Sequence, residues 1–244
     1  MFELRLLASF LVGGAFNGCV MWASERFGSR VGGILVGVPT TTFTSLLFIS
    51  LTSGSSAAHA AAIVIPPALA ADFVFAYAFT RLVHLRRELA LVIALALWLA
   101  LALLPALLHL ASFAISCGIY LIGLALALIL MHNYPRNTKG HTQASRWTHL
   151  FRILLSGCVV ASAVALAHFA GPLFGGVFAA FPALIASALY LLSRSQGPSF
   201  AKAMACQIPL GLCSTAAFVA LFYLAHSTPK CATSWHWQHL PFLA

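Results

Sequence analysis

The sequence has few charged side chains and very few acidic ones. Only 7% of its 244 residues are charged, with four Asp and Glu against 13 Lys and Arg, whereas 61% are apolar and the mean hydropathy is +0.98. A soluble domain carries about a quarter of its residues as charges, and a disordered chain carries few apolar ones. The composition therefore excludes both classes and predicts an all-α polytopic membrane protein.

Sequence patterns of enzymes and of metal sites are also missing. The six cysteines include no CxxC pair, so we interpret them as small apolar side chains rather than as a disulfide set. No phosphate-binding glycine loop, HExxH motif or nucleophile beside a base is present. Cys231, His236 and His239 gather near the C-terminus, but their spacing is loose and two tryptophans accompany them. We favour an interfacial aromatic tail and expect no metal and no cofactor.

Apolar runs of the length that a bilayer requires recur along the chain. Windows of about twenty apolar residues predict eight spans, at 6–24, 31–51, 57–80, 89–109, 111–132, 149–169, 172–192 and 203–225. No charged residue separates the fourth span from the fifth. We divide them because the combined run of ~44 residues is about twice the length of one crossing.

The basic residues indicate how the chain is oriented. Eleven of the 13 Lys and Arg fall in loops that eight spans place on one side, and only Arg5 and Lys230 fall on the other. Merging the fourth and fifth spans would erase this bias. The positive-inside rule therefore supports the division and predicts that both termini are extracytoplasmic. It also explains the net charge of +9, so we expect no nucleic-acid partner.

The chain contains an internal repeat. Residues 32–69 align without a gap with residues 175–212, which pairs Pro39 with Pro182 and also brings a glycine pair and a second proline into register. The two hairpins are five spans apart, an odd number, so the second copy must cross the membrane in the opposite direction. The sequence thus predicts an inverted-topology repeat.

The repeat also suggests how the chain is organised. We predict a first membrane repeat with two extra helices at 1–132, a basic cytoplasmic loop at 133–148, a second, inverted repeat at 149–225 and an extracytoplasmic tail at 226–244.

The second copy resembles a known family. Its motif "GGVFAAFPALIASALY", followed by "QGPSFAKAM" and a later proline, resembles the GlpM-type family of small, roughly four-helix bacterial membrane proteins. The likeness covers Gly175 to Pro209 and, more weakly, Gly32 to Asp72, where Val-Pro replaces Phe-Pro and threonines follow. The family lacks a well-defined activity. The resemblance implies a bacterial inner-membrane location and two such units joined as an inverted repeat.

Four prolines lie inside predicted spans, namely Pro39, Pro66, Pro182 and Pro209. Proline removes a backbone donor and kinks or interrupts a helix. Interrupted helices expose N–H and C=O groups, which a membrane protein tolerates only against protein or a watery cavity. Any one of these prolines is explained by an ordinary kink. Because the repeat relates all four, we predict helix breaks that surround a binding site.

Polar side chains near these prolines are the predicted substrate-binding residues. Three successive threonines follow Pro39, at the N-terminus of a half-helix whose dipole favours an anionic group. The alternative is that the hydroxyls bond back to carbonyls of the preceding turn and let helices pack closely. The predicted set is Thr40, Thr41, Thr42, Ser45, Asn17 and Gln207.

Asp72 is the only carboxylate inside a predicted span. An isolated carboxyl group in apolar surroundings is most stable when it carries a proton or faces a cation, so we predict proton coupling at Asp72. The alternative is an Asp that bonds to a neighbouring helix or reaches toward the membrane surface. His59 and Lys202 occupy equivalent positions in the two copies and are predicted gates, with interfacial anchoring as the alternative.

These observations favour a secondary transporter or flippase for a small polar or anionic substrate, coupled to H+. One alternative is a membrane-embedded enzyme acting on a lipid-linked substrate, which would need His59 or His168 beside Asp72. Another is a non-transporting partner subunit, which would have a dry, closely packed centre. Membrane lipid is the expected surrounding, and a homo-oligomer is left open.

Overall fold

A computed structural model describes residues 2–26, 34–35, 37–134 and 146–227. All regular elements in these ranges are helices. They are α1 (Phe2–Arg26), α3 (Thr40–Ser53), α4 (Ser55–Leu82), α5 (Arg87–Leu107), α6 (Phe113–Leu130), α7 (Arg146–Phe169), α8 (Pro172–Ala179), α9 (Ala183–Ser195), α10 (Pro198–Ala205) and α11 (Ile208–Ser227).

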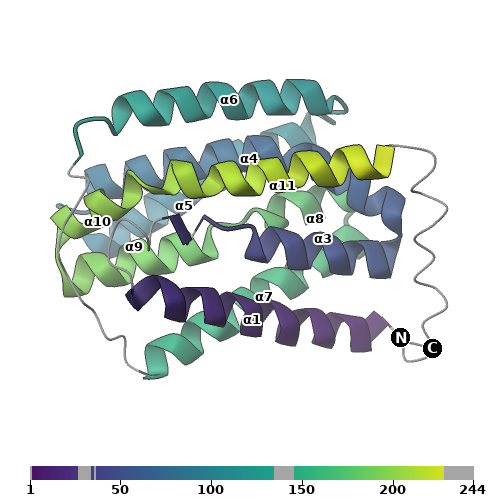
Figure 1. Cartoon of the computed structure of the whole chain (residues 1–244), viewed down its shortest axis with the longest axis horizontal. Helices are drawn as coiled ribbons and strands as arrows, with labels where there is room; N and C mark the ends of the chain where they lie inside the picture. The colour runs from purple at the N-terminus through teal and green to yellow at the C-terminus, as the bar shows by residue number, and fades with distance from the viewer. Residues whose placement is uncertain (1, 27–33, 36, 135–145, 228–244) are drawn as a thin grey trace.

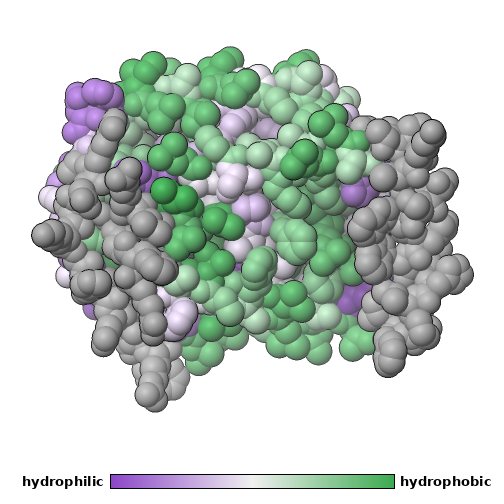
Figure 2. All heavy atoms as spheres, viewed as in Figure 1, coloured by the Kyte–Doolittle hydropathy of each residue, from purple (hydrophilic) through white to green (hydrophobic). Residues whose placement is uncertain are grey.

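The helices form a bundle in which most axes follow the long direction of the molecule (Figure 1). On the face shown in Figure 2, hydrophobic residues cover the central band, and hydrophilic residues gather toward the two ends of that direction. Within the described ranges, seven helical segments are long and apolar enough to cross a membrane. The fold is therefore an all-α polytopic membrane protein, as the composition predicts.

The segments correspond closely to the predicted spans. The predicted span 31–51 falls partly outside the described residues, and the 14 residues of α3 cover the rest of it. Predicted spans four and five are two separate helices, because α5 ends at Leu107 and α6 begins at Phe113. Between them His109 adopts a positive φ of 50°, and Ser112 caps α6 by accepting a bond from the Ile115 amide at 3.4 Å.

Two breaks interrupt the bundle, and their backbones have nearly the same conformation. Pro39 precedes α3 with φ −73° and ψ 39°, and Pro182 precedes α9 with φ −77° and ψ 43°. In the first break the Thr40 amide donates to the carbonyl of residue 38 at 2.7 Å. In the second break the Ala183 amide donates to the carbonyl of residue 181 at 2.8 Å. We call residues 37–39 the first break and residues 180–182 the second break.

The other two prolines differ from each other, since Pro66 causes no break and Pro209 follows one directly. α4 runs without interruption for 28 residues and contains Pro66 and Pro67 in its interior, so no break lies at Pro66. The reason is packing, because α4 is the central helix, and its buried surroundings hold it straight enough to tolerate two missing donors. Pro209 is the second residue of α11, and the interruption precedes it, at Cys206 and Gln207.

α4 lies at the centre of the bundle and is contacted by α5, α6, α8 and α11. Its buried surface contains many alanines beside larger side chains, and small residues let neighbouring backbones approach. A Cβ added to Gly176 of α8 would lie 2.2 Å from the carbonyl oxygen of Ala61. α1 packs along α7 on the outside of this core. α1 begins and α11 ends at the same end of the bundle (Figure 1).

Candidate functional site

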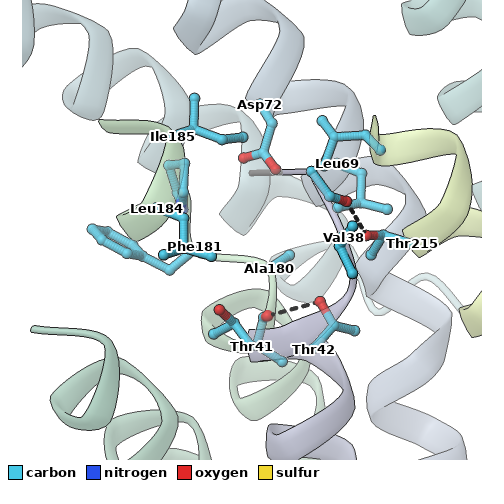
Figure 3. Close-up of a pocket in the computed structure, with 14 residues that line it drawn as sticks. Val38, Thr41, Thr42, Leu69, Asp72, Ala180, Phe181, Leu184, Ile185 and Thr215 are labelled. Carbon is cyan, nitrogen blue, oxygen red and sulfur yellow. Dashed lines mark hydrogen bonds between the residues drawn. The ribbon is translucent and has the colours of Figure 1, made fainter. Parts of the chain in front are cut away.

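The two breaks meet at a small buried cavity of about 30 Å³. Such a volume holds about two water molecules or one small ion. α3, α4, α9 and α11 complete its wall (Figure 3). The lining residues are Gly37, Val38, Thr41, Thr42, Leu69, Asp72, Ala179, Ala180, Phe181, Pro182, Leu184, Ile185, Leu212 and Thr215. The structure thus brings together segments that lie far apart in the sequence.

The first break is held against α11 by one hydrogen bond and one close backbone contact. Thr215 Oγ1 donates to the Gly37 carbonyl at 2.7 Å. A Cβ added to Gly37 would lie 2.6 Å from the backbone of Gly211, so only glycine fits at this crossing. The carbonyl that the break frees is therefore satisfied by a side chain of a neighbouring helix, as a membrane interior requires.

A second hydrogen bond joins two helices that flank the breaks, α3 and α8. Thr42, in the first turn of α3, donates from Oγ1 to the carbonyl of Ala179 at 3.1 Å. Ala179 is the last residue of α8, so this bond satisfies one of the carbonyls that the end of that helix leaves free.

Asp72 projects from the middle of α4 into the cavity, where Figure 3 shows its carboxyl group directed toward the second break. The residue is 2% exposed, and its Oδ1 makes no hydrogen bond within the described part of the chain. Trp98 of α5 is fully buried beside this carboxyl group, but its indole N–H does not reach hydrogen-bond geometry with it. A buried carboxyl oxygen without a hydrogen-bond partner lowers the stability of the fold unless a proton or a cation binds the group.

The alignment of residues 32–69 with 175–212 can be extended to Asp72, which then corresponds to Thr215. Asp72 and Thr215 are 143 residues apart, and so are Gly37 and Ala180. The first break faces a hydroxyl, which donates to its carbonyl. The second break faces a carboxyl group, which can donate to a carbonyl only when it carries a proton. The cavity can therefore hold a proton or a small cation at the Asp72 carboxyl group.

The three threonines after Pro39 hold α3 against α1 and line the cavity. Thr40 and Thr41 donate to Oδ1 of Asn17 on α1, the latter at 3.2 Å, and Asn17 Nδ2 donates to the Gly13 carbonyl at 2.8 Å. Thr41 also lines the cavity together with Thr42. Ser45 is buried one turn further along α3, and its hydroxyl has no partner among the described residues. The structure therefore brings five of the six predicted binding residues to α3 and the adjoining part of α1.

The remaining predicted residues lie away from the cavity. Gln207 is 5% exposed at the α10–α11 interruption and donates to Cys206 Sγ at 3.2 Å. The His59 ring stacks on Tyr223 with centroids 4.3 Å apart, and the Lys202 ammonium lies 5.9 Å from the centre of the Tyr134 ring. These aromatic contacts are typical of side chains near a membrane interface.

Two residues of interest are not evident from sequence reasoning. Arg152 reads as a basic loop residue, yet it lies inside α7, is 3% exposed and donates to the Ser187 carbonyl at 3.2 Å. Its position within a predicted span was the available signal. Trp98 sits in the middle of the fourth span, and nothing in the sequence places it beside Asp72.

Metal binding has no support in the part of the chain that the structure describes, which contains no group of three or more His, Cys, Asp and Glu side chains placed to hold an ion. The tail with Cys231, His236 and His239 lies outside the described residues.

No family model, no curated protein and no solved structure matches the chain.

Proposed function

We propose that this protein is a secondary transporter in which Asp72 binds the coupling proton at the point where two broken helices meet. One observation carries the proposal. A buried carboxyl group with an unpartnered oxygen lies in a cavity, lined by both polar and apolar groups, where the two breaks meet. Interrupted helices around a site near the middle of the bilayer are the usual architecture of ion-coupled transporters.

The proposal includes an inverted repeat, and the matched backbones support it. Besides the two prolines, Gly54 and Gly197 adopt similar conformations, with φ 91° and ψ 162° against φ 86° and ψ 171°, and they too are 143 residues apart. α3 and α9 lie toward opposite ends of the bundle (Figure 1). Two hairpins of opposite direction around one site allow the site to open alternately to each side.

Charge within the cavity favours a proton or a cation over an anion. The N-terminal ends of α3 and α9 bring partial positive charge to the cavity, whereas the end of α8 brings carbonyl oxygens. Asp72 already supplies the negative group. A polar or anionic substrate would therefore bind together with a proton on Asp72, and the volume of about 30 Å³ indicates that a larger substrate requires a more open state.

The enzyme alternative has less support. It requires a second ionisable group within reach of Asp72. The His168 ring stacks on Phe2 with centroids 4.4 Å apart, and the His59 ring stacks on Tyr223. Neither histidine lines the cavity. The partner-subunit alternative predicts a dry centre, which the polar groups around this cavity do not favour.

The orientation of the chain is also part of the proposal. We place both termini on the extracytoplasmic side of a bacterial inner membrane, in keeping with the distribution of the basic residues and the resemblance of the repeats to GlpM-type units.

The proposal is tested by substitution of the carboxyl group. A thermal-shift screen of the purified protein against metabolites identifies a ligand, because a molecule that binds only the folded state stabilises it. Uptake of that ligand into proteoliposomes is then followed together with internal pH. We expect Asp72→Asn to abolish the proton movement, while the matched variant Thr215→Ser, which retains its hydroxyl, keeps it. Proton-coupled uptake that survives Asp72→Asn would rule out the proposed role.

A further inference from the structure

A second, larger hollow lies on the side of the bundle, between α5, α7 and α9. It has a volume of about 490 Å³, within the range of small-ligand pockets. Its walls include Leu91 and Leu95 of α5, Leu155 of α7 and Ala186 of α9, and almost all of its lining is apolar. Phe151, which is 62% exposed, stands at its rim, so the hollow opens to the lipid-facing surface. We call it the lateral groove.

Phe181 joins the lateral groove to the Asp72 cavity. Among the described residues it is the one side chain that lines both spaces. Figure 3 shows its ring extending away from the cavity, and the ring packs edge-on against Trp98 with centroids 5.1 Å apart. Trp98 in turn lies beside the carboxyl group of Asp72. The Phe181 side chain therefore stands where the groove and the Asp72 cavity adjoin.

The chemistry along this path is that of an amphipathic cation. The outer part is apolar and suits a hydrophobic body. The inner end carries an unpartnered carboxylate oxygen, which suits one positive charge. Phe181 and Trp98 stand between them, and aromatic rings attract cations through their faces. An anion or an uncharged lipid chain would leave the negative charge of the Asp72 carboxylate without a positive charge opposite it.

We propose that the lateral groove admits a lipophilic cation from the membrane and delivers its charge to Asp72, with Phe181 as the partition between groove and cavity. The cation and the proton then compete for the same carboxylate, which is how uptake of one would drive release of the other. This inference rests on the proposed function, because it takes Asp72 as the coupling site, and it assigns a lipophilic cation as the substrate in place of the polar or anionic substrate expected from the sequence.

Binding of radiolabelled tetraphenylphosphonium to the purified protein tests the inference. This probe combines one positive charge with an apolar body. Tetraphenylborate has the same shape with a negative charge, and tetramethylammonium has the charge without the body. We expect saturable binding of tetraphenylphosphonium alone, with an affinity that rises by up to about tenfold per pH unit while Asp72 loses its proton.

Variants separate the groove from the carboxyl group. Asp72→Asn should abolish binding of tetraphenylphosphonium. Leu155→Trp fills the groove and should weaken binding at least tenfold, as should Leu91→Trp from the opposite wall. Leu154→Trp is the matched control, because Leu154 is 45% exposed, does not line the groove and should leave binding unchanged. Gel filtration and thermal unfolding check that each variant is folded.

The outcomes distinguish this inference from the proposed function. The inference is overturned if tetraphenylborate binds as well as tetraphenylphosphonium, or if neither Leu155→Trp nor Leu91→Trp changes the binding. The lateral groove would then be a site that a membrane lipid occupies. Absence of tetraphenylphosphonium binding would also overturn it, while the proposed function stands if Asp72 still binds a proton reversibly. If Asp72 shows no reversible protonation, the proposed function and this inference are both wrong.

Discussion

Asp72 and Thr215 occupy corresponding positions in the two copies, yet they carry different chemical groups. The hydroxyl of Thr215 satisfies the hydrogen-bonding need of the first break, since it donates to the Gly37 carbonyl. The carboxyl group of Asp72 faces the second break and keeps Oδ1 unpartnered within the described residues. In the proposed repeat, one copy has a structural hydroxyl where the other has a carboxyl group, and this difference is the chemical basis of the proposed function.

Thr215→Val should destabilise the protein without changing its shape. The variant has nearly the same volume but leaves the Gly37 carbonyl without its donor in a buried break. We expect the free energy of unfolding to fall by about 1–3 kcal/mol. The matched control is Ser214→Ala, because that exposed hydroxyl bonds only within its own helix, to the Gly211 carbonyl. An equal effect of the two substitutions in denaturant-induced unfolding would contradict the role of Thr215.

Sequence reasoning identified the polar residues but not their partners. Asp72 could be found because no other predicted span contains a carboxylate. The pairing of Thr40 and Thr41 with Asn17 depends on how α1 crosses α3, which no local pattern encodes. Trp98 and Arg152 were missed for the same reason, since each looks ordinary in its own segment and becomes notable only beside a residue from another helix.

At the scale of elements, the first break depends on glycine at its crossing with α11. A Cβ on Gly211 would lie 2.3 Å from the carbonyl oxygen of Ile34 and 2.8 Å from the Cα of Gly37, so the two backbones would have to move apart. Gly211→Ala should therefore separate the break from α11 and lower the free energy of unfolding by roughly 1–3 kcal/mol or more. Gly118→Ala in α6 is the control, because no described atom lies within 4 Å of an added Cβ. Similar unfolding curves for the two variants would show that the crossing is looser than described.

The boundaries of the elements were largely predictable, because bilayer thickness sets the length of an apolar run. The separation of α5 from α6 followed from counting charges on the two sides. The behaviour of the prolines was less predictable. Pro39 and Pro182 stand at true breaks, whereas Pro66 lies in a continuous α4, because a lost hydrogen bond interrupts a helix only where the surrounding packing permits it.

At the scale of the whole molecule, the distribution of charge predicts the orientation. Of the eleven bases counted on one side, Arg152 is buried inside α7, and the other ten still predict that this side is cytoplasmic and that both termini lie outside. Alkaline phosphatase fused to the C-terminus of the full chain should therefore be active, and green fluorescent protein fused at the same place should be dark. The same reporters fused after Asn133, between α6 and α7, should give the opposite result. A fluorescent C-terminal fusion would reverse the assigned orientation.

The most direct measurement of the central claim is modification of Asp72 by a hydrophobic carbodiimide, which reacts from the membrane with protonated carboxyl groups. Mass spectrometry of the modified wild type should locate one adduct at Asp72, with a rate that falls as pH rises and the group loses its proton. Asp72→Asn should carry no adduct in that segment, and Thr215→Ser should react as the wild type does. An Asp72 that never reacts, or that reacts at the same rate at every pH, would contradict a reversible proton site where the two breaks meet.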